Sequence, residues 1–201
     1  MAAADEFDAW LLDLDGTLYR ARWVKLLMAA ELAIGGWSAV APLRRFRHEH
    51  ELIREQGETN DPFRLQLTRT AEALKMEPDE LAALVQSWMI ERPGRWLGRF
   101  KRSELFDEIR TFRAGGGKTA VVSDYPARSK LRALGASALF DAVVASGEPG
   151  GPRRLKPDPG GYLRAADALG VRPERCLVIG DRDDADGAAA RAAGMSFRLV
   201  R

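Results

Sequence analysis

The chain has 201 residues, of which 46% are hydrophobic, so a globular domain with an insertion is expected and wholesale disorder is excluded. Its 31 lysines and arginines against 29 aspartates and glutamates leave a formal net charge of +2, too small to predict nucleic acid as a partner. The single cysteine, Cys176, excludes an internal disulfide framework and a multi-cysteine zinc site, and a cytoplasmic location is predicted.

Membrane signals are weak. The N-terminus has no basic region followed by an apolar run, so no signal peptide is predicted. The uncharged run from Leu32 to Leu43 has 12 residues, short of the roughly 20 needed to cross a bilayer. We therefore expect no membrane partner.

Five short apolar runs predict buried strands, at 9–13, 119–123, 142–145, 176–180 and 196–200. Continuous apolarity is typical of a parallel sheet that is covered on both faces. Helical patterns lie between the later runs, at 103–114, 126–135, 159–170 and 184–194, the first with Ser103 as its N-cap. This alternation predicts an α/β fold, a doubly wound, mainly parallel five-stranded Rossmann-like sheet.

The stretch from 20 to 100 has no convincing strand. Helical patterns occupy 25–34, 43–56, 62–76 and 78–91, and Asp61 before Pro62 is a helix-start signal. An all-helical insertion at 20–100 is therefore predicted within an α/β core formed by 1–19 and 101–201.

Some side chains of the insertion have two interpretations. Four tryptophans, Trp23, Trp37, Trp88 and Trp96, are interpreted mostly as its core, with a self-association surface as the alternative. His48 and His50 lie among arginines, and a solvated helix face is favoured over a metal site. Five cations lie where the chain returns to the core and either attract anionic substrates or lie exposed; they are Arg92, Arg95, Arg99, Lys101 and Arg102.

The carboxyl ends of the predicted strands carry the chemically interesting residues. Asp13 and Asp15 follow the first strand, Ser123 ends the second, Lys156 follows the third, and an acidic loop at 181–186 follows the fourth. Open α/β sheets bind ligands at these ends, so the side chains are expected in one crevice. Taken alone, Ser123 would be interpreted as an ordinary strand-end serine and Lys156 as a solvated lysine.

The two acidic segments predict a metal site. Asp13 and Asp15 are two apart on an extended segment and point the same way. A divalent cation or a shared proton would relieve their repulsion, and a simple Asp-Gly turn is the alternative interpretation. The later loop holds four aspartates, more than a helix N-terminus alone explains. Ligands that are all oxygens suit Mg²⁺.

Four ordered segments resemble the signature motifs of the haloacid dehalogenase-like hydrolase superfamily. They are 13–19, 121–124, 156–159 and 180–186, the last continuing to 193–195. The resemblance covers the α/β portion. A helical insertion directly after the first motif is typical of the subgroup that contains phosphoglycolate phosphatase and β-phosphoglucomutase.

The resemblance implies a Mg²⁺-dependent phosphatase that hydrolyses phosphate monoesters of small metabolites. Asp13 would be the nucleophile that forms an aspartyl-phosphate, and Asp15 the general acid and then the base. Ser123 and Lys156 would hold the phosphoryl oxygens.

The implied metal ligands are the Asp13 side chain, the Asp15 backbone carbonyl and Asp181. Asp186 would support this metal site, a role that Asp183 or Asp184 could take or share. Dehalogenases of the family lack an aspartate at the position of Asp15, so its presence argues for phosphate ester chemistry.

Two alternative functions remain at this point: a phosphomutase of sugar phosphates that uses the same aspartate pair, and a non-catalytic interaction protein on the same fold. The expected partner is a small phosphorylated metabolite, and a monomer or a homodimer is expected.

Overall fold

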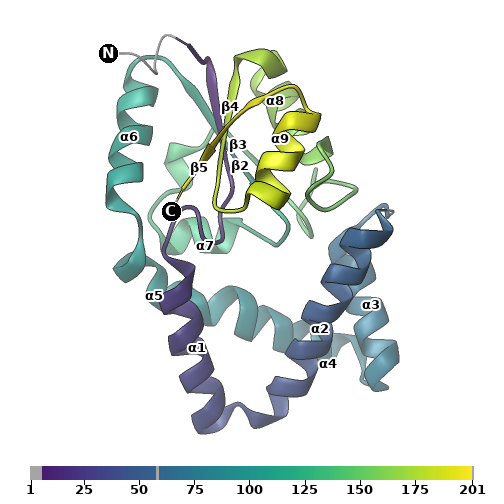
Figure 1. The fold of residues 1–201 in the computed structure, drawn as a ribbon. Coiled ribbons are helices and arrows are strands. Elements are labelled where there is room, and N and C mark those ends of the chain that lie inside the picture. Colours follow the sequence, from purple (N-terminus) through teal and green to yellow (C-terminus); the bar gives the residue numbers. More distant parts are fainter. Residues whose placement is uncertain (1–5, 58, 201) are drawn as a thin grey trace.

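The computed structural model describes residues 6–57 and 59–200. Among them, five strands form one sheet in the order β3-β2-β1-β4-β5, and every neighbouring pair is parallel (Figure 1). The strands are β1 (Ala9–Leu12), β2 (Lys118–Ser123), β3 (Ala142–Ala145), β4 (Cys176–Gly180) and β5 (Ser196–Leu199). The predicted fold class is confirmed.

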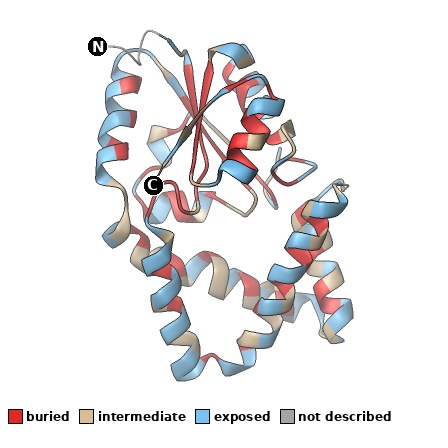
Figure 2. Ribbon diagram, viewed as in Figure 1, coloured by how far each residue is buried: buried red, intermediate tan, exposed pale blue. Residues whose placement is uncertain are grey.

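Helices cover both faces of the sheet, which explains why the strands are apolar on both sides. They are α6 (Ser103–Ala114), α7 (Arg128–Ala133), α8 (Gly160–Leu169) and α9 (Ala188–Ala192). Trp10 and Leu12 of β1 pack in one hydrophobic cluster with α6 and α7, and the alternating Ala9 and Leu11 pack in a second with α8 and α9. Figure 2 shows the buried residues gathered in the central strands.

The chain between β1 and α6 is helical and lies at one end of the sheet (Figure 1). Its elements are α1 (Ala21–Gly35), α2 (Trp37–Gln56), α3 (Pro62–Leu74), α4 (Pro78–Val85), a π-helical turn (Gln86–Glu91) and α5 (Arg92–Phe100). The chain leaves and returns side by side, because Tyr19 and Lys101 form an antiparallel bridge. We call this helical segment the cap; its division from the core at 20 and 100 stays a prediction.

Several local predictions need correction. Helix α5 was not predicted, because its two glycines and proline mask a single buried leucine, Leu97. Ser103 is the first residue of α6 rather than its cap, and no side chain caps that helix. The segment predicted as one helix at 184–194 divides into a π-helical turn (Asp183–Gly187) and α9. Asp61 does cap α3, accepting from the Arg64 backbone N–H at 3.0 Å.

The remaining helical turns are short 3₁₀ segments at Ser137–Leu139 and Pro173–Arg175, and the helix predicted at 126–135 is limited to α7. Cys176 is buried in β4, as expected. The core interpretation is wrong for Trp23 and Trp37, which are 49% and 72% exposed. None of the helices within 6–57 and 59–200 has the length and apolarity that a bilayer crossing requires.

Candidate active site

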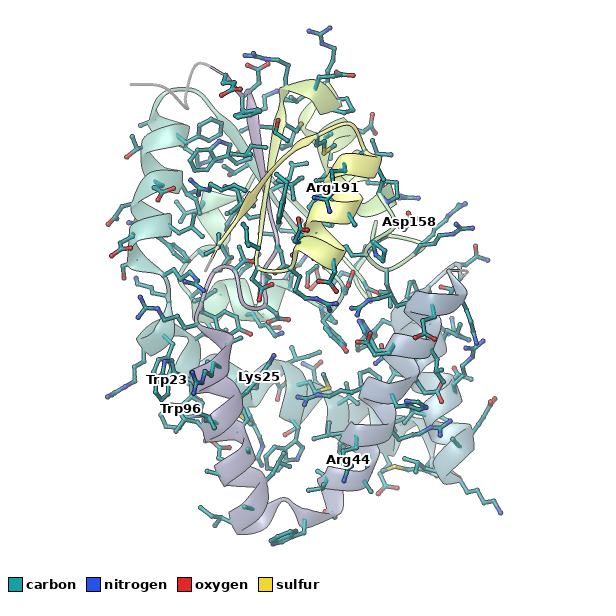
Figure 3. The ribbon with its side chains drawn as sticks, in the orientation of Figure 1. Trp23, Lys25, Arg44, Trp96, Asp158 and Arg191 are labelled. Atoms are coloured by element: carbon teal, nitrogen blue, oxygen red, sulfur yellow. The ribbon has the colours of Figure 1, made fainter. Side chains whose placement is uncertain are left out.

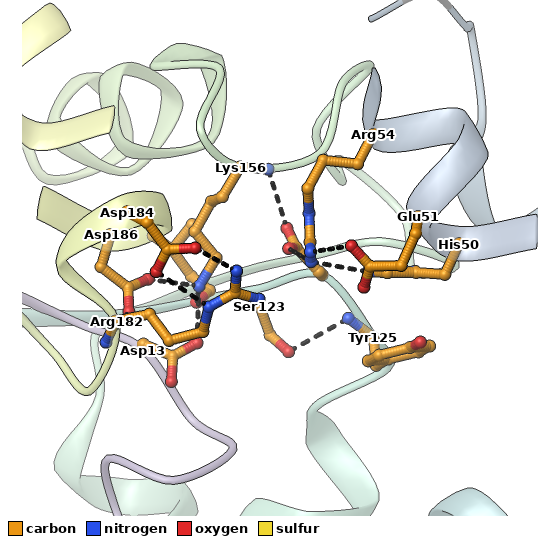
Figure 4. Close-up of polar contacts among 12 residues, drawn as sticks. Asp13, His50, Glu51, Arg54, Ser123, Tyr125, Lys156, Arg182, Asp184 and Asp186 are labelled. Atoms are coloured by element: carbon orange, nitrogen blue, oxygen red, sulfur yellow. Dashed lines mark hydrogen bonds and ion pairs between the residues drawn. The ribbon is translucent and has the colours of Figure 1, made fainter. Parts of the chain in front are cut away.

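The carboxyl ends of the three central strands open into one cavity of about 470 Å³, a volume that suits a small metabolite. Asp13 follows β1, Ser123 ends β2 and Asp181 follows β4. The parallel register that pairs the last residue of β1 with both neighbours brings these ends together. Lys156 and Asp186 line the same cavity (Figure 4).

Lys156 joins two buried carboxylates. Its Nζ lies 2.5 Å from Asp13 Oδ1 and 2.8 Å from Asp186 Oδ1. Asp13 also accepts from the Thr17 hydroxyl at 3.0 Å, and Asp186 accepts from the Tyr162 hydroxyl at 2.9 Å. Charges this deeply buried require close partners, so the ammonium and the two carboxylates stabilise one another.

The electrostatic balance differs between the two ends of this contact. Burial raises the pKa of Asp13 to about 7, a rise that Lys156 opposes and Asp186 reinforces. Burial alone would lower the pKa of Lys156, but Asp13 and the other neighbouring anions outweigh it and hold that pKa well above its ordinary value. The site therefore keeps a permanent cation beside a carboxylate that is costly to ionise.

Three carboxylates can hold a cation. One oxygen each from Asp13, Asp181 and Asp186 lies within 4.8 Å of the others. Burial and then the charge of Asp186 raise the pKa of Asp181, so this group also lacks sufficient positive charge nearby. A set of oxygen ligands with excess negative charge fits a hard divalent cation.

Gly16 is what lets Asp181 approach the first loop. Its φ is +107°, and a Cβ at this position would lie 1.9 Å from Asp181 Oδ2. Any side chain there would displace the Asp181 carboxylate from the site. Gly16 is thus required for two reasons: its positive φ disfavours any other residue, and the Asp181 carboxylate leaves no room for a side chain.

The structure separates the three candidates for the metal-supporting acid. Asp183 is exposed and pairs with Arg191 at 2.9 Å, and Asp184 is exposed and pairs with Arg182. Asp186 is buried and belongs to the carboxylate group described above. The geometry therefore supports Asp186, although its role stays a prediction.

Asp15 has a partner that sequence reasoning missed. Lys130 Nζ lies 2.7 and 2.6 Å from its two carboxylate oxygens, and the Tyr19 hydroxyl donates to Oδ1. Burial raises the pKa of Asp15, but Lys130 and the hydrogen bonds outweigh it, and the net pKa is below the ordinary value. Lys130 is itself buried on α7 between Ala127 and Leu131, and a lysine on an apolar helix stripe is the signal that could have found it.

The loop after β2 holds the other predicted residues in place. Ser123 Oγ accepts from the Tyr125 backbone N–H at 3.2 Å, and Asp124 accepts from the Lys156 backbone N–H at 3.2 Å. Arg54 of α2, in the cap, donates from its guanidinium to the Asp124 carboxylate at 3.4 Å. Ser123 and Lys156 are both buried at the floor of the cavity, so the alternative of a solvated lysine is wrong.

His50 connects the cap to the same loop, so the solvated-face interpretation is wrong for it. Its ring stacks on Tyr125 with centroids 4.5 Å apart, and its nitrogens contact Gln66 Oε1 at 3.2 Å and Arg54 at 3.0 Å. Burial, together with Arg54, lowers the pKa of His50 although Asp124 opposes this shift, so the ring is neutral at neutral pH. His48 is exposed, as expected.

The five cations near the return to the core lie outside the cavity lining. Arg92 and Arg95 instead contact Glu31 of α1 at 3.4 and 2.9 Å. The geometry therefore favours the exposed-hinge interpretation over substrate attraction for Arg95.

Comparison with known proteins identifies the family. Residues 7–194 match the haloacid dehalogenase-like hydrolases. The chain is 29% identical to the glyceraldehyde 3-phosphate phosphatase of Methanopyrus kandleri, over 96% of this chain and 83% of that protein. It is 27% identical to the fructose-1-phosphate phosphatase of Escherichia coli, over 98% of each.

Solved structures agree in fold. The β-phosphoglucomutase of Clostridium difficile aligns with a TM-score of 0.64 at 20% identity, over 97% of this chain and 85% of that one. The chain belongs to the haloacid dehalogenase-like hydrolases. Within that family, its curated relatives place it among the phosphatases, and the family generally uses Mg²⁺.

Proposed function

We propose that this protein is a Mg²⁺-dependent phosphatase that hydrolyses phosphate monoesters of small metabolites through an aspartyl-phosphate. The observation that carries the proposal is the buried Asp13 carboxylate at the floor of the cavity, 2.5 Å from Lys156 and within reach of two further carboxylates. A nucleophile, a fixed cation and a divalent cation site are the parts that phosphoryl transfer requires.

Asp13 attacks phosphorus and becomes phosphorylated, while the ester oxygen leaves with the bond electrons. Lys156 and Ser123 hold the phosphoryl oxygens, and the buried ammonium offsets the charge that develops on them. Water then attacks the phosphorus of the aspartyl-phosphate, which releases phosphate and restores the Asp13 carboxylate.

Asp15 moves the protons. The leaving oxygen takes a proton from Asp15 in the first step, and Asp15 takes one from the attacking water in the second. The contact with Lys130 holds the carboxylate ionised, which suits the second step. For the first step we propose that Asp15 separates from Lys130 and takes up a proton when substrate fills the cavity.

Metal binding would use the Asp13 side chain, the Asp15 backbone carbonyl and Asp181, with Asp186 in support. When bound, Mg²⁺ supplies positive charge against the transferring phosphoryl group. Asp13 and Asp181, whose pKa values are raised by burial, are the groups whose ionised forms such a cation favours.

The substrate class follows from relatives and volume. The relatives named above act on glyceraldehyde 3-phosphate and fructose 1-phosphate, and a phosphoserine phosphatase of Thermus thermophilus is 31% identical over 67% of this chain. These names support a small phosphorylated metabolite as substrate. A cytoplasmic location and a monomer or homodimer stay predictions.

The experiment is phosphate release from a panel of phosphate monoesters, with Mg²⁺ and with EDTA. We expect release only with Mg²⁺, and a loss of about 10³-fold or more in kcat for Asp13→Asn. Asp107→Asn, an exposed change on α6, serves as the matched control and should keep wild-type activity. Full activity in excess EDTA would contradict the proposal, and isomerised sugar phosphate without net release would indicate a phosphomutase.

A further inference from the structure

Six cationic side chains line the cavity, and four of them form ion pairs with carboxylates. Lys156 contacts Asp13 and Asp186, and Lys130 contacts Asp15. The other two are arginines: Arg54 pairs with Glu51 and Asp124, and Arg182 pairs with Asp184. These cations have their charge offset before any substrate arrives.

Lys25 and Arg47 differ from those four. Both line the cavity, and neither has a hydrogen bond or ion pair with any residue that the structure describes. Lys25 is on α1 and Arg47 on α2, so the two charges come from the two long cap helices. In Figure 3, Lys25 and Trp23 lie on opposite sides of α1, and Lys25 is on the side that faces α2.

Both cations line the cavity together with residues of the site. Lys25 shares the lining with Asp181 at the metal-binding edge, and Arg47 shares it with Tyr125, which lies two residues after Ser123. The two cations therefore face the cavity from its cap side, opposite the phosphoryl-binding floor.

The wall beside these cations is apolar. It is formed by side chains of α1, the start of α2 and the π-helical turn, namely Val24, Met28, Leu43, Trp88 and Met89. A leaving group on this side of the cavity would contact the apolar side chains along its length, and its far end would lie near the positive charges of Lys25 and Arg47. The charge of a second anion would be offset there by two groups with no other partner.

We propose that the substrate is a phosphate monoester whose leaving group carries a second anionic group, a carboxylate or a phosphate, bound by Lys25 and Arg47. This inference rests on the proposed function, because it takes Asp13 and Lys156 as the phosphoryl-binding end. Monoesters with a neutral leaving group are bound only by that end and the apolar wall, and are the poorer substrates.

The test is binding of non-hydrolysable phosphonates with Mg²⁺ present, measured by calorimetry. Alkylphosphonates are compared with ω-carboxyalkylphosphonates and alkylene bisphosphonates of the same chain length, in a series of increasing length. We expect the probes with a second anionic group to bind at least about tenfold more tightly than the alkylphosphonates at the best length, as for one charge-assisted hydrogen bond. The carboxylate and bisphosphonate arms distinguish the two kinds of second anion.

Matched variants locate the effect. Lys25→Met and Arg47→Met should each remove most of the preference and leave alkylphosphonate affinity unchanged. Arg22→Met and Arg44→Met, three residues earlier on the same helices and outside this cavity lining, should keep it. Equal binding by the wild type of probes with and without the second anionic group would overturn the inference, as would equal losses for all probes in the two cavity variants.

The binding readout separates this inference from the proposed function. Anion preference without any phosphate release would support the Lys25 and Arg47 site and contradict the phosphatase. Phosphate release with equal kcat/KM for monoesters with neutral and with anionic leaving groups would support the phosphatase and contradict the anion site formed by Lys25 and Arg47.

Discussion

The ionisation of Asp13 predicts how metal and pH act on stability. The pKa of this carboxyl is about 7 in the folded protein and ordinarily 3.8. Because the folded pKa is raised, the contribution of this carboxyl group to the stability of the metal-free protein is fully present below about pH 4 and is lost as the pH rises toward about 7. At about 1.4 kcal/mol per pH unit, the loss approaches about 4 kcal/mol.

Asp13→Asn removes this loss. The free energy of unfolding of the metal-free variant, taken relative to that of the wild type, should rise by about 3 kcal/mol between about pH 5 and about pH 8. The variant also loses the 2.5 Å contact with Lys156. This loss lowers its free energy of unfolding at every pH, but it does not change how the difference from the wild type increases with pH. Mg²⁺ should stabilise the wild type increasingly over the same interval, because binding requires the ionised carboxylate, and should stabilise the variant much less.

The assay is urea unfolding in EDTA and in Mg²⁺, at several pH values, for the wild type, Asp13→Asn and the surface control Asp107→Asn. Using the difference between variants cancels the titration of all other groups. Parallel pH dependences for wild type and Asp13→Asn in EDTA would refute the reasoning. So would equal stabilisation of both proteins by Mg²⁺.

Three further changes probe the neighbouring groups. Lys130→Met leaves the Asp15 carboxylate, whose side chain is 29% exposed, without its cationic partner, so the free energy of unfolding should fall by about 2 kcal/mol at about pH 7. Since the folded pKa of Asp15 is lowered, this pair stabilises above about pH 4 and its contribution disappears at lower pH; a pH-independent loss in urea titrations would argue against it. Asp15→Asn should slow alkyl phosphates more than activated aryl phosphates, because an aryl leaving group needs little protonation, and equal kcat losses on both would exclude Asp15 as the acid. Lys156→Met should lower kcat/KM by about 10²-fold or more, with Lys156→Arg recovering part of it; steady-state kinetics showing a wild-type value would remove Lys156 from the phosphoryl site.

The sheet could be predicted from sequence because each strand is buried on both faces and reads as a continuous apolar run. The same reasoning located Asp13, Ser123 and Asp181 together, since parallel strands share one carboxyl edge. Helix α5 was missed because its only buried leucine lies among glycines and a proline. The exposure of Trp37 was missed because burial of a cap residue depends on how the helices pack, which the local pattern does not contain.

The partners of the site residues also depend on long-range contacts. Lys130 meets Asp15 across 115 positions of the chain, and Lys156 meets Asp13 across 143. The resemblance to a family placed Asp13 and Lys156 in one site, without predicting their contact, and gave no role to Lys130. His50 is covered by Tyr125 of the core and by Gln66 of α3, both distant in sequence, so its local sequence, which is rich in arginine, indicated the wrong environment.

The central claim is that Asp13 becomes phosphorylated during turnover. Asp15→Asn should slow the second step and accumulate the intermediate, so this variant and the wild type are mixed with an aryl phosphate and Mg²⁺ and quenched. Borohydride reduction followed by peptide mass spectrometry then locates the acyl phosphate, which is reduced to homoserine. We predict homoserine at position 13, absent without Mg²⁺ and absent in Asp13→Asn; continued turnover with no reduced residue at position 13, or with the label elsewhere, would contradict the account.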